Sequence, residues 1–133
     1  MLVTDPQRLL IQYCMEGNVK ALQSVLQKLE SAATEEKPFN INQVIEEHTG
    51  YSLLHWAAFM NHIHVGKLLV DHGIDCNLKD KSGNTAAHIC CEFNHHELLN
   101  VLVETKKVLL DTGGQTPLHL AVSKEHVECV KIL

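Results

Sequence analysis

The sequence predicts an all-α repeat solenoid, a row of stacked helix-turn-helix units with short β-hairpin-like finger loops between them. The first observation is self-similarity: residues 50–58, 83–91 and 114–122 align on one histidine each, which are His55, His88 and His119. These histidines are 33 and 31 residues apart, a period that indicates a repeat architecture. The second is that another histidine follows in each unit at the same register, at His62, His95 and His126. The third is that an apolar run follows each of the histidines of this second set. Such a run forms a helix face that only a neighbouring unit can bury.

The composition bounds the possible partners. The chain has 133 residues, enough for one domain, of which 45% are apolar and 20% charged, as in ordinary globular proteins. Its net charge of −5 argues against nucleic-acid binding, which needs a basic surface, and against docking on anionic lipid. No apolar run approaches the ~18 residues of a membrane span, and residues 1–6 lack the start of a signal peptide. We therefore expect neither nucleic-acid nor membrane partners.

The cysteines indicate a compartment. Their number, five, is odd, and no two have Cys-x-x-Cys spacing. A reduced thiol set is therefore favoured over a disulfide framework. This predicts a cytoplasmic protein, with the nucleus as the alternative.

Residues 1–30 are predicted to form a degenerate first unit. Asp5 and Pro6 provide its helix start, and Gly17 stands where the next unit carries Asn61. The apolar face of its second helix comes from Leu22, Val25 and Leu26. Gly17 and Asn61 are 44 residues apart, about eleven more than the repeat period. Residues 31–46 are therefore interpreted as an insertion or linker, with a loop at 30–38.

Residues 47–79, 80–110 and 111–133 are predicted to be the second, third and fourth units, the last of them incomplete. Each first helix follows a hydroxyl residue that can accept a hydrogen bond from a first-turn amide: Ser52, Thr85 and Thr116. Pro117 occupies the first helical position, where its missing amide hydrogen costs nothing. Turns are expected at the glycines that precede these caps, Gly50, Gly83 and Gly114, and Gly73 is placed to end a helix in the left-handed conformation.

These motifs resemble the ankyrin repeat family. Residues 116–121 are close to the family's Thr-Pro-Leu-His sequence, and residues 73–77 match the loop that closes a unit. The resemblance implies that His55, His88 and His119 are structural hydrogen-bonding groups that tie neighbouring units together. Residues 104–111 depart from the pattern, because they lack the closing Gly-x-Asp-x-Asn loop. The chain also stops inside the second helix of the fourth unit, so we expect further repeats or domains after it.

Ten histidines invite a metal hypothesis. The two repeated histidine positions account for six of them, and ligands one repeat apart lie roughly 10 Å from each other, too far for tetrahedral zinc. The best local cluster is Cys90, Cys91, His95 and His96, but both cysteines fill core positions. We therefore expect no metal and no cofactor.

The sequence also lacks catalytic motifs. It has no glycine-rich phosphate loop and no Gly-x-Ser-x-Gly, and the spacing of His88 and Cys91 follows from the repeat itself. It therefore predicts a non-catalytic protein–protein interaction module without a small-molecule substrate. Two alternatives stay open: the recognition arm of a larger multidomain enzyme of kinase or acyltransferase type, and an inhibitor of a transcriptional regulator.

The resemblance implies that a protein or peptide partner lies in a concave groove and contacts the finger loops and the exposed ends of the first helices. The residues at those positions are Tyr51, Phe59, Met60, Lys81, Asn84, Glu92, Phe93, Gln115 and Lys124. A solvated groove is usually polar at such positions, so the large apolar side chains among them form a candidate anchor.

Two aspects of this anchor stay open in the sequence. Phe59, Met60 and Phe93 can instead pack against each other or under the loop at 31–38. Trp56 lies at an inner position of its helix, where burial in the core is favoured over a role in binding.

Overall fold

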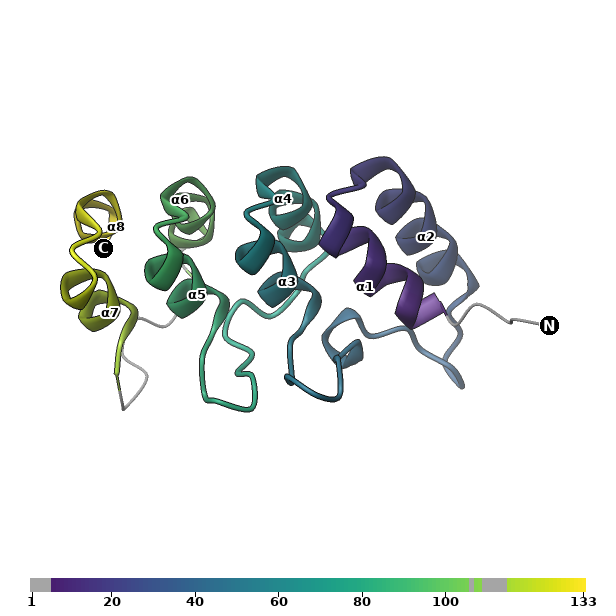
Figure 1. Ribbon diagram of the computed structural model, residues 1–133. Coiled ribbons are helices and arrows are strands. Elements are labelled where there is room, and N and C mark those ends of the chain that lie inside the picture. Colours follow the sequence, from purple (N-terminus) through teal and green to yellow (C-terminus); the bar gives the residue numbers. More distant parts are fainter. Residues whose placement is uncertain (1–5, 106, 109–114) are drawn as a thin grey trace.

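The computed structural model describes residues 6–105, 107–108 and 115–133, and in these ranges the chain forms four helix pairs in a row (Figure 1). The pairs are α1 (Pro6–Glu16) with α2 (Val19–Ala32), α3 (Leu53–Met60) with α4 (Ile63–Asp71), α5 (Ala86–Phe93) with α6 (His96–Glu104), and α7 (Pro117–Ser123) with α8 (Val127–Ile132). The described part contains no β-sheet, only one isolated bridge between Ile45 and Ser52. The predicted all-α repeat solenoid is therefore confirmed.

The helices lie in two layers. The first helices of the pairs, α1, α3, α5 and α7, follow one another in one layer, and the second helices form the other (Figure 1). Contacts run along each layer between neighbouring pairs and across the layers within a pair. Buried side chains from all four pairs belong to one hydrophobic cluster. Each pair therefore buries its apolar face against the next, as expected of a solenoid.

The first helices of the last three pairs begin with the same double cap. The hydroxyl oxygens of Ser52, Thr85 and Thr116 accept the backbone N–H of the histidine three residues later, at 3.3, 3.4 and 3.2 Å. In return, Nδ1 of that histidine accepts the backbone N–H of the cap residue at 3.0–3.1 Å. Histidine thus takes the place that Glu or Gln has in the common capping box, which fixes the orientation of its ring.

The helix ends depend on the left-handed backbone conformation. Asn61 and Asn94 end α3 and α5 with φ of 57° and 58°, and Gly73 follows α4 with φ of 83°. No glycine follows α6. Instead the Thr105 hydroxyl donates to the Leu102 carbonyl at 2.7 Å, so a side chain satisfies the helix end where the sequence departs from the family loop.

Small residues allow the close approach of neighbouring pairs. The alanine pair at 57–58 in α3 and the cysteine pair at 90–91 in α5 are fully buried. Between the second helices, a Cβ added to Gly66 of α4 would lie 2.4 Å from Cδ1 of Leu98 in α6. The spacing of the two layers is therefore set by positions that carry little or no side chain.

The segment between the first and second pairs differs from the predicted loop at 30–38. Helix α2 continues to Ala32, so the predicted start of the loop is wrong. Residues 30–32 are Glu, Ser and Ala, which do not break a helix, and part of the extra length lengthens α2 to 14 residues, against nine in α4. A 3-10 turn, η1 (Ile41–Gln43), then buries Ile41, and the bridge to Ser52 starts the next finger inside the range 31–46.

Some predicted features cannot be compared. The helix start at Asp5, the turn at Gly114 and the boundary between the third and fourth units at 110–111 lie outside the described residues. In the described part, no helix has the length and apolar character needed to cross a membrane.

Candidate partner-binding surface

The finger loop before α3 is organised by Glu46. Its carboxylate accepts the Thr49 hydroxyl at 2.6 Å and the backbone N–H groups of Thr49 and His48 at 2.8 and 2.9 Å. These hydrogen bonds favour the ionised carboxylate, the Thr49 hydroxyl most, and lower the pKa of Glu46 to about 2. The Glu46 backbone N–H also donates to the Tyr51 carbonyl at 2.9 Å. The backbone of Tyr51 is thus held before any partner arrives.

Asp80 has the same role in the next finger. Its carboxylate accepts the backbone N–H groups of Ser82 and Asn84 at 2.8 and 2.9 Å. The two fingers also bond to each other, because the Lys81 N–H donates to the Thr49 carbonyl at 3.0 Å.

Gly50 makes the contact between the two fingers possible. It has φ of 74°, and a Cβ at this position would lie 2.8 Å from the backbone nitrogen of Lys81. The contact therefore needs a residue without a side chain.

The repeated histidines connect each first helix to the following finger. Since Nδ1 of His55 accepts a backbone N–H, its Nε2 carries the proton and donates to the Asn84 carbonyl at 2.8 Å. Nε2 of His88 likewise donates to the Gln115 carbonyl at 2.6 Å. The backbones of two predicted contact residues, Asn84 and Gln115, are therefore fixed by the preceding unit.

Four rings form a continuous chain of contacts across the second and third units, which we call the aromatic row: Tyr51, Trp56, Phe59 and Phe93. The Tyr51 ring lies edge-on to Trp56, with centroids 5.0 Å apart, and 6.1 Å from Phe59. Phe59 of α3 and Phe93 of α5 meet edge to face at 5.5 Å. Such pairs are favourable by ~0.5–1.5 kcal/mol beyond their area burial. The row therefore couples two neighbouring units.

The row remains accessible although its members contact each other. Phe59, Met60 and Phe93 are 39%, 40% and 47% exposed. The alternative in which these side chains pack against one another is thus realised for Phe59 and Phe93, but neither becomes buried.

The predicted contact residues differ in exposure and lie in three successive units. Lys81, Gln115 and Lys124 are exposed, whereas Tyr51, Asn84 and Glu92 are half-buried. Ring contacts run from Tyr51 to Phe59 and from Phe59 to Phe93, whereas Lys124 lies at the end of α7, in the next unit.

Trp56 differs from a fully buried core residue. It is half-buried and packs against the core, and its ring also touches Tyr51 and Phe59. Its Nε1 is inaccessible to solvent and has no hydrogen-bond partner in the described part of the chain. Trp56 therefore belongs both to the core and to the base of the aromatic row.

Sequence reasoning missed Met15 and the two finger carboxylates. Met15 is 37% exposed and precedes Gly17 by two residues, as Phe59 precedes Asn61, so the register of the first unit could have indicated it. Glu46 and Asp80 could not be assigned in this way, because the two sequences around them are not alike.

Negative charge surrounds the tyrosine of the row. Burial raises the pKa of Tyr51, and the charges of Asp80 and Glu92 raise it further. Glu92 is the repeat equivalent of Phe59, since each lies four residues after the first-helix histidine of its unit. Among the described residues, the Glu92 side chain has no hydrogen-bond partner and no ion pair.

The thiols and the histidines offer little reactive chemistry. Burial raises the pKa of Cys14 and of Cys91 to about 12, and that of Cys90 well above its usual value. The nucleophilic form of cysteine is the thiolate, so these thiols stay protonated at neutral pH. No three His, Cys, Asp or Glu side chains within the described ranges are grouped so that they could hold a metal ion.

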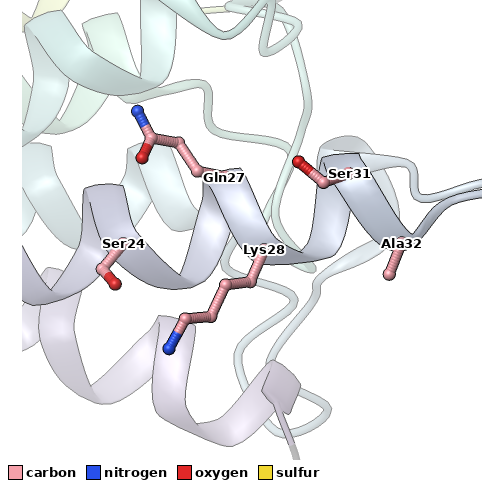
Figure 2. Close-up of a pocket in the computed structure, with 5 residues that line it drawn as sticks. All are labelled: Ser24, Gln27, Lys28, Ser31 and Ala32. Atoms are coloured by element: carbon pink, nitrogen blue, oxygen red, sulfur yellow. The ribbon is translucent and has the colours of Figure 1, made fainter.

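One shallow hollow of the surface lies on α2. Its lining side chains all belong to α2, and Figure 2 shows them along one helix: Ser24, Gln27, Lys28, Ser31 and Ala32. Because one helix supplies the whole lining, this surface lacks the converging groups of a ligand site.

Comparison with known proteins agrees with the fold. A family model described as ankyrin repeats (3 copies) matches residues 2–80 and 75–133. The Notch-regulated ankyrin repeat-containing protein A of Danio rerio is 30% identical over 102 residues, which are 77% of this chain and 85% of that protein.

Two longer proteins match over a smaller part of their length. A probable E3 ubiquitin-protein ligase of Oryza sativa subsp. japonica is 29% identical over 85 residues, 62% of this chain and 17% of the ligase. The SMC5-SMC6 complex localization factor protein 1 of Homo sapiens is 37% identical over 89 residues, 63% of this chain and 8% of that protein. The chain thus spans less than a fifth of either.

Proposed function

Because the chain belongs to the ankyrin repeat family, whose members are interaction modules, we propose that it binds a protein or peptide partner along its concave groove, with the aromatic row as the anchor. The observation that carries this proposal is that Phe59 and Phe93, from neighbouring units, touch each other and stay 39% and 47% exposed. Exposed aromatic clusters with a polar rim are typical of interaction sites.

The surroundings of the row support the same proposal. The fingers are held by Glu46, Asp80 and the inter-finger bond between Thr49 and Lys81, so little backbone order has to be acquired on binding. Exposed polar side chains occupy other predicted contact positions in the third and fourth units, at Lys81, Gln115 and Lys124. No chemistry is assigned to the chain, because ankyrin repeats are in general non-enzymatic interaction modules and the chain matches only the repeats.

Affinity capture with truncated aromatic side chains tests the proposal. Wild type, Phe59→Ala, Phe93→Ala and the double variant are immobilised and exposed to the same cell extract. Val127→Ala is the control, because Val127 is 59% exposed but lies on α8, outside the row. A partner retained by wild type and control should bind each aromatic variant ~2 kcal/mol more weakly, about 30-fold in Kd. Each variant should still unfold cooperatively, at a somewhat lower temperature because ring contacts are lost. If every captured protein binds the double variant as well as wild type, the row is not the anchor.

The match to the rice ligase favours a second candidate function. This chain matches 17% of the length of that protein, which is named as an enzyme. We propose as the alternative that the repeats are the recognition arm of a longer enzyme. Sequencing the full transcript distinguishes the two, because only the alternative requires a catalytic domain in the same chain.

Inhibition of a transcriptional regulator is a further possibility that the net charge of −5 favours, because such partners carry basic surfaces. Binding of a basic partner should then weaken steeply with salt.

We also propose a cytoplasmic location, with the nucleus as the alternative, since all five cysteines are free thiols.

A further inference from the structure

The aromatic row combines exposed ring surface with nearby negative charge. Tyr51, Trp56, Phe59 and Phe93 form an unbroken set of ring contacts at 5.0–6.3 Å. An aromatic ring carries negative electrostatic potential on its faces, which attracts cations. The rings by themselves, however, would bind an apolar side chain of a partner equally well.

The carboxylates decide between these two kinds of ligand. Glu92 occupies, one unit on, the register of Phe59, and precedes Phe93 directly. It lies beside Phe93 on α5, and Asp80 belongs to the finger that is hydrogen-bonded to the finger of Tyr51 through Lys81 and Thr49. The charges of both carboxylates raise the pKa of Tyr51, in agreement with this placement. Oδ1 of Asp80 accepts two backbone N–H groups, whereas the carboxylate of Glu92 has no hydrogen bond or ion pair in the described part of the molecule.

An uncompensated carboxylate disfavours an apolar ligand. Covering Glu92 with an aliphatic side chain would remove its water without replacing the lost hydrogen bonds, which costs free energy. An anionic side chain would be repelled by Glu92 and Asp80. A cation gains from the ring faces and from the carboxylate together.

We propose that the aromatic row receives an arginine side chain of the partner, which lies against the rings of Phe59 and Phe93 while Glu92 accepts hydrogen bonds from its guanidinium group. Arginine fits better than lysine, because its planar group stacks on rings and presents paired donors to a carboxylate. The net charge of −5 adds a long-range attraction for a basic segment. This inference rests on the proposed function, since it specifies what the partner presents to the anchor.

Selection from a random peptide library tests the inference without knowledge of the partner. Twelve-residue peptides displayed on phage are selected on wild type and on Glu92→Gln, and recovered peptides are tested for binding to the Phe59→Ala/Phe93→Ala variant. Glu36→Gln is the matched control, because it removes the same charge at an exposed loop residue. Peptides from wild type and from Glu36→Gln should share one arginine position that Glu92→Gln no longer selects.

The best peptide is then synthesised with arginine or with citrulline, which keeps the shape and loses the charge. Citrulline should weaken binding to wild type about tenfold or more, but should change binding to Glu92→Gln much less, because the charge pairs with Glu92. Emission of Trp56, the one tryptophan of the chain, reports binding directly.

The outcomes separate the inference from the proposed function. Peptides that need Phe59 and Phe93 but lack a basic residue, or that bind the citrulline form equally well, overturn the inference and leave the proposed function standing. Failure to select any peptide that depends on Phe59 and Phe93 overturns both.

Discussion

His55 illustrates how much one side chain contributes to this fold. Its Nδ1 accepts the Ser52 N–H inside the unit, and its Nε2 donates to the Asn84 carbonyl in the next finger. The first bond needs the neutral ring, because a protonated imidazole has no acceptor nitrogen, whereas the Nε2–H donates in either state. Burial lowers the pKa of His55 from 6.5, against smaller opposing effects from Asn84 and Asp80.

We therefore expect acid to weaken the fold through His55. Below pH 6.5, His55 binds a proton in the unfolded chain but stays neutral in the folded chain. The free energy of unfolding therefore decreases as the pH falls from 6.5 to the lowered pKa of folded His55. Urea unfolding of wild type at pH 7.5, 6.5 and 5.5 should show this loss, and His55→Gln should show less of it. The exposed His64 is the control, and His64→Gln should keep the wild-type slope. Parallel slopes for wild type and His55→Gln would contradict the assignment. The stabilisation from the lowered pKa of Glu46 is fully present above pH 4.5 and is lost only as the pH falls from there toward about 2, outside this range.

The helix junction at Gly17 leaves no room for a side chain, whereas the helix end at Gly73 does. Gly17, between α1 and α2, has φ of 77°, and a Cβ there would lie 2.7 Å from the ring of His62. That ring reaches the Met15 carbonyl at 3.0 Å and so joins the first pair to the second. Gly73 has a similar φ of 83° but nothing within 4 Å of an added Cβ.

These two glycines separate backbone strain from steric conflict. Gly73→Ala should lower the free energy of unfolding by ~1 kcal/mol, the cost of a left-handed alanine. Gly17→Ala carries the same strain and must also displace His62, so its loss should be larger by ~1–3 kcal/mol. Chemical denaturation of both variants measures the difference. Equal losses would mean that the His62 contact does not matter.

The stack as a whole is held by contacts between adjacent units. Among the second helices, α4 contacts both α2 and α6, and Figure 1 shows α4 between them. Stability in such a row is close to a sum of unit terms and nearest-neighbour terms. Substitutions in distant units should therefore add, and substitutions across one interface should not.

Double-variant cycles can measure this difference. Leu22→Ala in α2 and Leu102→Ala in α6 should add within ~0.5 kcal/mol, because α4 separates them. Gly66→Ala and Leu98→Ala should couple, because truncating Leu98 removes the atom that lies 2.4 Å from an added Cβ. The added methyl group should thus cost less in the Leu98→Ala background. Strong coupling of the distant pair would contradict a modular stack.

The sequence alone determined the repeat, the helix pairs and the caps. These are local properties: a hydroxyl three residues before His55, His88 or His119 and a period of 31–33 residues are visible in one dimension. It also placed Phe59 and Phe93 at equivalent ends of neighbouring helices, which is enough to expect them close together.

Only the tertiary structure decided what those residues touch. The end of α2 at Ala32, the organisation of the fingers by Glu46 and Asp80, and the hydroxyl that closes α6 depend on local geometry that varies between units. The half-burial of Trp56 and the contact of Phe59 with Phe93 depend on the distance between stacked units. The periodicity of a sequence gives the order of the units, but their separation is set by side-chain volumes packed across each interface.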